Sequence, residues 1–268
     1  MSSAKDELIR ESVRERYGDI ARQGDSGCCG PSSDCGDTEM IDLIKVQNQH
    51  SSQMGYSDDE LISVPQGANM GLGCGNPQAI AALKPGETVL DLGSGAGFDS
   101  FLAARQVGEK GMVIGVDMTP DMISKARENT RKGSFGNVEF RLGEIEHLPV
   151  ADRCVDVIIS NCVINLSTDK PAVFRESYRV LKPGGRLAIS DVVATAELPE
   201  EIINDLKLYS ACVSGALMIS DLESVLADCG FIEIKIEPKD ESREFIREWA
   251  TEIPLEEYVQ SATIKARK

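Results

Sequence analysis

The chain has 268 residues, enough for one large α/β domain with appendages or for two small domains. Its 44 acidic side chains outnumber the 28 basic ones and give a net charge of −16, which disfavours nucleic acid as a partner because phosphates would be repelled. No run is long and apolar enough to span a bilayer, and the first residues lack the apolar core of a signal peptide, so we expect a cytoplasmic protein with no membrane partner.

An amphipathic helix is predicted at the start of the chain, from Ala4 to Arg22. Apolar side chains recur along it at spacings of four, four and three residues, at Ile9, Val13, Tyr17 and Ile20. This spacing places them on one face of the helix, which we expect to pack against the rest of the protein. The remaining charged side chains would form a solvated face.

A glycine- and serine-rich loop at residues 24–36 carries three of the eight cysteines, Cys28, Cys29 and Cys35. Eight cysteines without a secretion signal indicate chemical or packing roles more than a disulfide framework. A thiol in a polar loop does not fit the role of a small buried hydrophobe, so we expect redox or ligand chemistry there. Zinc binding is the competing interpretation, although Cys28 and Cys29 lack the usual two-residue gap between chelating cysteines.

Residues 55–75 are predicted to form a loop that one short helix interrupts. A capping box of Ser57 and Glu60 would start this helix. A further helix is expected at Asn76-Pro77, with the asparagine as its cap and the proline at its first position.

The stretch 89–98 carries the strongest functional signal. A short buried strand, residues 89–92, runs into a glycine-rich turn, and a helix is expected from Phe98 to Val107. In an open parallel sheet, ligands collect at the carboxyl ends of the strands, where backbone N–H groups and a helix N-terminus meet them. The next apolar run, residues 112–116, ends on Asp117, whose carboxylate can accept both hydroxyls of a ribose. The pattern predicts a nucleoside site.

The spacing of the glycines separates two kinds of cofactor. A dinucleotide fingerprint has its third glycine three positions after the second, but Gly95 is followed by Gly97, and Phe98 stands where that glycine should fall. Asp91, just before the turn, would repel a pyrophosphate and suits a cationic ligand. The block resembles the class I S-adenosylmethionine-dependent methyltransferases, in which a sulfonium nucleoside occupies this position.

That resemblance implies an S-adenosylmethionine site along the carboxyl edge of the sheet. Glu144 and Ile145, in the loop of residues 143–149, would lie at the edge of the adenine, with a plain surface loop as the alternative. The full set of cofactor-binding candidates is Asp91, Gly93, Ser94, Gly95, Gly97, Asp117, Met118, Glu144, Ile145 and Asn161.

The rest of the chain alternates strands and helices, which is typical of a parallel sheet. The expected elements are a helix from Thr119 to about Arg131, strands 137–142 and 155–160, a helix 171–181, a strand 186–192, a helix from Pro199 to about Tyr209, a helix that Ser220 and Glu223 cap, and strands 231–237 and 258–265. We predict a Rossmann-like α/β fold of the class I methyltransferase type, with a mostly parallel seven-stranded sheet and an antiparallel last strand. Residues 1–75 would form an N-terminal extension and residues 76–268 the methyltransferase domain.

Four further stretches narrow the resemblance to the arsenite methyltransferases. They are Gly71–Pro77, Ser160–Leu166, Ser190–Ala194 and Ala211–Leu217. Membership of that family implies that Cys74, Cys162 and Cys212 bind trivalent arsenic beside the cofactor, with an arsenic-binding insertion around residues 194–220. It also implies thiol exchange by N-terminal cysteines, for which Cys28 and Cys29 are the candidates. The cysteine-rich extension that follows the last strand in some relatives is not expected here.

The implied substrates are arsenite and methylarsenite, with a thiol reductant such as thioredoxin or glutathione as co-substrate. A soft ion selects thiolates, and arsenic held by three of them keeps a lone pair that can attack a methyl group. Because arsenic sheds no proton in that attack, no general base is required, which fits a chain whose two histidines, His50 and His147, read as polar loop residues. Cys154 and Cys229 are expected to have packing roles.

Two alternative functions remain open from the sequence. One is a methyltransferase that acts on carbon or oxygen of a small metabolite, such as a quinone precursor, with cysteines that are merely structural. The other is a non-enzymatic protein of the same fold that binds a metalloid or zinc.

Overall fold

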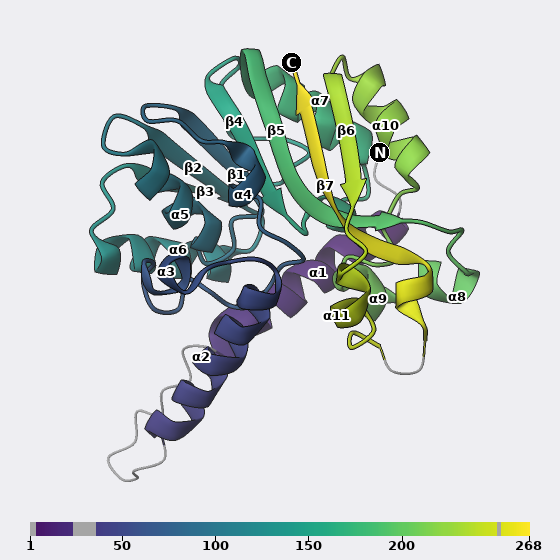
Figure 1. Cartoon of the computed structure of the whole chain (residues 1–268), viewed down its shortest axis with the longest axis horizontal. Coiled ribbons are helices and arrows are strands. Elements are labelled where there is room, and N and C mark those ends of the chain that lie inside the picture. Colours follow the sequence, from purple (N-terminus) through teal and green to yellow (C-terminus); the bar gives the residue numbers. More distant parts are fainter. Residues whose placement is uncertain (1–3, 24–35, 251–252) are drawn as a thin grey trace.

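The computed structural model describes residues 4–23, 36–250 and 253–268, and in it two layers of helices cover a seven-stranded sheet (Figure 1). The strands are β1 (Thr88–Leu92), β2 (Met112–Asp117), β3 (Val138–Leu142), β4 (Val155–Asn161), β5 (Leu181–Ala194), β6 (Ile232–Pro238) and β7 (Val259–Arg267). Their order across the sheet is β3-β2-β1-β4-β5-β7-β6. Strands β1 to β5 pair in parallel, and β7 is antiparallel to both β5 and β6. The predicted sheet, including its antiparallel last strand, is confirmed.

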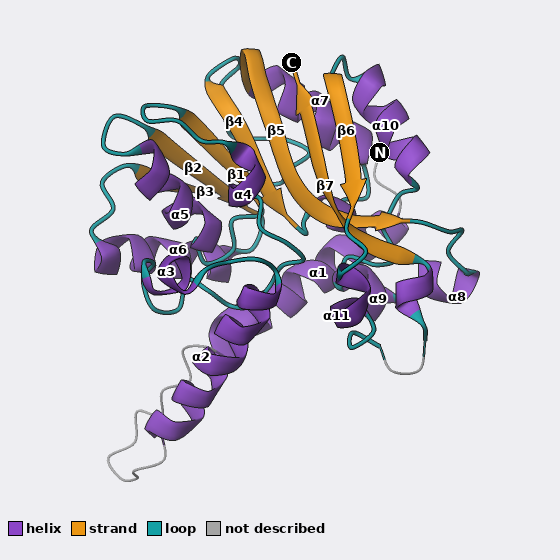
Figure 2. Ribbon diagram, viewed as in Figure 1, coloured by secondary structure: helices purple, strands orange, loops and turns teal. Residues whose placement is uncertain are grey.

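Helices cover both faces of this sheet, as Figure 2 shows. On one face lie α4 (Gln78–Ala81), α5 (Phe98–Val107) and α6 (Pro120–Gly133), and on the other α7 (Lys170–Val180) and α10 (Ile219–Asp228). Strand β4 is fully buried from Val157 to Ser160, which explains its almost continuously apolar sequence.

Three more helices precede α4 in the described part of the chain: α1 (Ala4–Gln23), α2 (Gly36–Gln53) and α3 (Asp58–Ile62). Helix α1 passes below the edge at which β4 ends, and α2 projects away from the sheet (Figure 1). The predicted capping box at α3 is confirmed, since Ser57 and Glu60 bond each other's backbone N–H. Helix α2 was not predicted.

Two local predictions after β5 are wrong, and His50, which was expected in a loop, lies in α2. The helix expected from Pro199 to Tyr209 is two helices, α8 (Glu200–Ile203) and α9 (Leu206–Ser210), because the Asp205 carboxylate accepts hydrogen bonds from the backbone N–H groups of residues 207 and 208 and so caps a new helix. The capping box expected at Ser220 is absent, because α10 already begins at Ile219 and has no side-chain cap.

The remaining elements are two short 3-10 helices, η1 (Ile164–Leu166) and η2 (Leu255–Glu257), and helix α11 (Ser242–Ile246). The 3-10 helix η1 directly follows the end of β4. Among the described helices, none combines the length and the apolar character that crossing a membrane requires.

Candidate active site

A cavity of about 340 Å³ lies at the carboxyl edge of the sheet. Its lining includes helix α1, the end of α2 and the loop that precedes Cys74, the glycine-rich turn after β1, the ends of β2 and β4, the loop at residues 145–146 and the segment around Cys212. This is the position at which the crossovers of a parallel sheet leave room for a ligand.

The glycine-rich turn is held against Asp117. The Gly95 backbone N–H donates to Asp117 Oδ2 at 2.9 Å, and the Thr119 N–H donates to Oδ1 at 2.8 Å. Gly93 has a positive φ of 68°, and a Cβ there would lie 2.4 Å from the Val163 side chain, so no other residue fits. Burial raises the pKa of Asp117, although both N–H donors oppose the shift.

The lining suits a nucleoside that carries a positive charge. The Ser94 hydroxyl is buried and has no hydrogen-bond partner among the described residues, so it remains available to a ligand. A Cβ built at Gly95 meets nothing within 4 Å, which leaves the backbone of the turn open to the cavity. Carboxylates in the lining outnumber guanidinium groups: Asp91, Asp99, Asp117 and Glu146 against Arg10 and Arg16.

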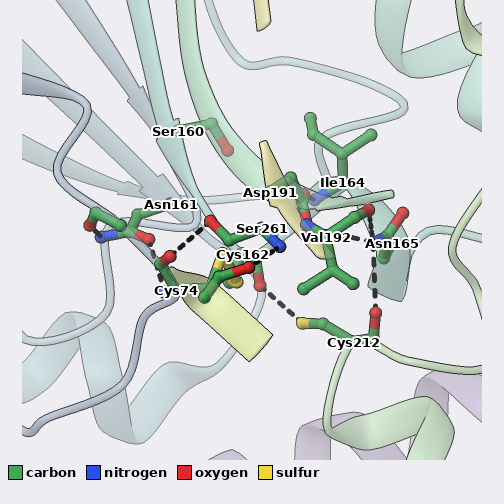
Figure 3. The surroundings of a disulfide bond; sticks show 12 residues. Cys74, Ser160, Asn161, Cys162, Ile164, Asn165, Asp191, Val192, Cys212 and Ser261 are labelled. Atoms are coloured by element: carbon green, nitrogen blue, oxygen red, sulfur yellow. Dashed lines mark hydrogen bonds between the residues drawn. A yellow bond between two sulfur atoms is a disulfide. The ribbon is translucent and has the colours of Figure 1, made fainter. Parts of the chain in front are cut away.

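Three cysteines from separate parts of the chain meet beside this cavity (Figure 3). Cys74 and Cys162 form a disulfide with their Cα atoms 5.9 Å apart, and the Cys212 thiol donates to the Cys162 carbonyl at 2.8 Å. A disulfide was not expected from the cysteine count, because a distance between two loops at a sheet edge cannot be read from spacing along the chain. The disulfide brings together two of the three predicted arsenic ligands.

The backbone at two of these cysteines is unusual. Cys162 has φ of 55° and Cys212 has φ of 64°, the left-handed region that non-glycine residues rarely adopt. Such conformations persist where the surrounding structure enforces them, and they concentrate at functional sites.

Buried charges surround Cys212. Burial raises the pKa of its thiol well above the usual value, and Asp191 raises it further, while Arg16 and Lys170 lower it. Burial also raises the pKa of Asp191 to about 6. One carboxylate oxygen of Asp191 lies within 4.8 Å of the sulfurs of Cys74 and Cys162. The site therefore holds Cys212 as a neutral thiol at neutral pH.

Most of the predicted cofactor-binding residues line the cavity: Asp91, Gly93, Ser94, Gly95, Asp117, Met118, Ile145 and Asn161. Glu144 and Gly97 do not. Glu144 forms an ion pair with Arg14 at 3.4 Å. Glu146, two residues further along, lines the cavity instead, and its carboxylate accepts a hydrogen bond from the Ser167 hydroxyl at 2.5 Å. Cys28, Cys29 and Cys35 lie outside the described residues.

The sequence did not indicate that α1 closes one side of the cavity. Val13, Arg16 and Tyr17 line it, and the apolar stripe of the helix packs against Leu166 and Cys212. The stripe was recognised as a packing face, but its partner is set by the tertiary fold.

Lys170 gives the site a pH dependence that can be measured. Burial lowers its pKa to about 8, so its contribution to stability is complete above pH 10.5 and is lost as the pH falls through 8. We expect Lys170→Met to lack this loss of stability, which is about 3 kcal/mol for a pKa shift of this size. In Lys170→Met, the Ser167 carbonyl loses the hydrogen bond from the Lys170 ammonium but keeps the one from the Tyr209 hydroxyl.

Urea unfolding of both proteins at pH 7 and pH 10 checks this. The wild type should gain stability relative to Lys170→Met as the pH rises. An unchanged difference between the two proteins would contradict the prediction.

Comparison with known proteins agrees with this geometry. A family model described as a methyltransferase domain matches residues 83–233. An arsenite methyltransferase of Halobacterium salinarum is 55% identical over 98% of this chain and 67% of its own length. Another from Aquipseudomonas alcaligenes is 46% identical over 85% of this chain and 63% of its own length. The chain thus spans about two thirds of the length of these relatives.

One solved structure is similar in both sequence and fold. It is the crystal structure of an arsenic(III) S-adenosylmethionine methyltransferase from Chlamydomonas reinhardtii, which is 32% identical. The match covers 84% of this chain and 72% of that chain, with a TM-score of 0.59.

Proposed function

We propose that this chain, which belongs to the arsenite methyltransferase family, transfers methyl groups from S-adenosylmethionine to thiol-bound trivalent arsenic. One observation carries the proposal: Cys162 and Cys212 line the same cavity as Asp117 and Ser94. Thiols and a nucleoside pocket thus share one space, as a direct transfer between their ligands requires.

The chain's own residues would bind and orient the two substrates. When bound, S-adenosylmethionine supplies an electrophilic methyl group on a sulfonium. Asp117 would accept the ribose hydroxyls, Ile145 and Glu146 would border the adenine, and the carboxylates of the lining would favour the sulfonium charge. Cys74, Cys162 and Cys212 would hold arsenic with its lone pair directed at the methyl group.

Arsenic binding does not change the net charge of this site. Arsenous acid that exchanges its three hydroxides for three thiols releases three waters, because each thiol proton leaves with a hydroxide. A neutral complex forms from neutral partners, which suits a site where burial keeps the Cys212 thiol protonated.

A thiol reductant is part of the proposal for two reasons. The Cys74–Cys162 disulfide must take up two electrons and two protons before both sulfurs can bind arsenic. Methyl transfer also raises arsenic formally to the pentavalent state, so repeated turnover consumes two further electrons. Thioredoxin or glutathione would supply them in the cytoplasm, where thiols are kept reduced. The methylated products would serve detoxification.

The proposed domain division follows these roles. Residues 1–75 form the extension that supplies Cys74 and α1, residues 76–268 form the methyltransferase domain, and residues around 194–220 supply Cys212.

Alkylation mapping tests the arsenic site directly. The reduced protein is treated with a thiol-alkylating reagent, with and without arsenite, and modified cysteines are identified by mass spectrometry. We expect arsenite to protect Cys74, Cys162 and Cys212 but not Cys154 or Cys229. The comparison uses those of the three that react without arsenite, because burial keeps the Cys212 thiol protonated and slows its alkylation. If arsenite protects none of them, the proposed site is wrong.

Cys28 and Cys29 are proposed to serve thiol exchange and not the transfer step. Replacement of both by serine should slow repeated turnover at least tenfold, because reduction would become limiting, while a single turnover on prebound arsenic keeps its rate. Rapid-quench and steady-state assays separate the two regimes. An equal loss in both would make these cysteines arsenic ligands or structural residues.

A further inference from the structure

Two asparagines flank Cys162 and each contacts the backbone of another cysteine. Asn161 is the last residue of β4, and Asn165 lies in η1, four residues later (Figure 3). Both side chains belong to the segment that also carries Cys162. All three cysteines are therefore connected through five consecutive residues.

The Asn161 side chain makes hydrogen bonds to the backbone of Cys74 and of the next residue, Gly75. Its Oδ1 accepts the Cys74 N–H at 3.1 Å, and its Nδ2 donates to the Gly75 carbonyl at 2.8 Å. The backbone of Gly73 lies against the same amide, where a Cβ would come within 2.8 Å of Nδ2. The loop of Cys74 thus packs closely against the Asn161 side chain, while the Ser261 hydroxyl binds the Cys74 carbonyl at 2.6 Å.

Asn165 holds the backbone of Cys212 in a similar way. Its Nδ2 donates to the Cys212 carbonyl at 3.1 Å, and also to Asp191 Oδ1 at 3.0 Å and the Val192 carbonyl at 2.6 Å. The carbonyl of Asn165 lies against Gly215, where a Cβ would come within 2.0 Å of that oxygen. Asn165 is only 4% exposed, so these bonds are made away from solvent.

We propose that Asn161 and Asn165 are positioning residues that set the places of Cys74 and Cys212 relative to Cys162. Asn161 would thereby control the reaction of substrates that need three thiols, and Asn165 that of every thiol-bound substrate. The inference rests on the proposed function and deepens it, because it assigns the choice between arsenite and methylarsenite to one side chain.

The Asn161 and Asn165 side chains should affect the reactions of arsenite and methylarsenite differently. Arsenite offers three positions to thiols, whereas methylarsenite offers two, so only arsenite requires Cys74 at a fixed distance. A displacement of about 1 Å at a reacting group can cost roughly a hundredfold in rate. Loss of the Asn161 amide removes the bonds at the Cys74 N–H and the Gly75 carbonyl, so that the Ser261 hydroxyl alone holds the Cys74 backbone, through its carbonyl. The contacts between Cys162 and Cys212, which Asn165 and the Cys212 thiol supply, remain.

The kinetic test compares Asn161→Ala and Asn165→Ala on both arsenicals. We expect Asn161→Ala to lower kcat/KM for arsenite at least tenfold more than for methylarsenite. Asn165→Ala should lower both at least tenfold and leave their ratio unchanged. Affinity for S-adenosylmethionine, measured by calorimetry, should stay within threefold of wild type in Asn165→Ala, because Asn165 does not line the cavity. Asn161 does line it, so both arsenicals are compared at saturating S-adenosylmethionine.

Gln78→Ala is the matched control for Asn161→Ala. Gln78 is a buried amide that donates to the Asp99 carbonyl, in the same network as Asn161, but no described bond joins it to a cysteine. Its loss should affect both substrates equally. If Asn161→Ala changes the substrate ratio no more than Gln78→Ala does, the proposal is overturned. The Asn161 result decides this even if Asn165→Ala does not fold.

A second readout does not depend on methyl transfer. Because Asn161 holds Cys74 next to Cys162, its removal should lower the effective concentration of one thiol at the other. We expect the disulfide of Asn161→Ala to be half reduced at an at least threefold lower ratio of reduced to oxidised glutathione, while Gln78→Ala stays at the wild-type ratio. An unchanged glutathione ratio in Asn161→Ala would refute the proposed positioning of Cys74 by Asn161. A chain that methylates neither arsenical would refute only the proposed function.

Discussion

Replacement of Cys74 by serine should reduce methylation of arsenite at least a hundredfold while methylarsenite remains a substrate. Methylarsenite already carries one carbon on arsenic and offers only two positions to thiols. A site with two cysteines can therefore hold it, but arsenite would keep one hydroxide and lose its third anchor. Serine at Cys162 or Cys212 should abolish both reactions, because each removes one of the remaining two anchors.

The geometry supports the choice of Cys74 as the dispensable thiol. Cys162 and Cys212 are joined by the bond from the Cys212 thiol to the Cys162 carbonyl, whereas Cys74 comes from a separate loop before α4. Mobility of the Cys74 loop is not the reason, because Cys74 is only 1% exposed, and Asn161 and Ser261 bind its backbone. Valence makes one thiol dispensable for methylarsenite, and the bond between Cys212 and Cys162 indicates that this thiol is Cys74.

Steady-state rates with each arsenical, measured by mass spectrometry of the products, check this prediction. Cys229→Ser and Cys154→Ser are the controls, since both cysteines pack beside the main hydrophobic core and neither lines the cavity. Wild-type methylation of arsenite by Cys74→Ser would contradict a site of three thiols and favour the small-metabolite alternative.

Asp117→Ala should weaken binding of S-adenosylmethionine by about 2–3 kcal/mol, or roughly 30- to 150-fold. The variant leaves the ribose hydroxyls without their charged acceptor. It also removes the carboxylate that the N–H groups of Gly95 and Thr119 bind, so the glycine-rich turn loses its support. The protection of the three cysteines by arsenite should persist, because none of those bonds reaches them.

Calorimetric titration with S-adenosylmethionine measures this effect. Asp121→Ala is a suitable control, because Asp121 lies four residues further along, in the first turn of α6, and pairs with Arg22 outside the cavity. Unchanged affinity in Asp117→Ala would remove this residue from the cofactor site.

Much of the fold could be predicted because its signals are local. The apolar strands, the glycine-rich turn and the acid at the end of β2 each have a signature within a few residues, and a parallel sheet then brings the carboxyl ends of its strands to one edge. Asp91, Asp117 and Asn161 meet there as expected. The family resemblance added the three cysteines, which composition and spacing alone would not have singled out.

Contacts between distant segments could not be predicted. The disulfide, the packing of α1 over the cavity and the hydrogen bonds of Asn161 and Asn165 to the cysteine backbones depend on segments at least 47 residues apart. A different cause explains why Glu146, and not the predicted Glu144, lines the cavity. The direction of each side chain in an irregular loop follows from its backbone angles, and no periodic pattern reveals those.

Transfer of an isotopically labelled methyl group tests the central claim most directly. The reduced protein is incubated with labelled S-adenosylmethionine and either arsenite or a panel of quinone precursors, and the labelled product is identified by mass spectrometry. We predict label on arsenic, none on the organic acceptors, and no transfer by Cys212→Ser. Label on a quinone precursor, with none on arsenic, would contradict the account.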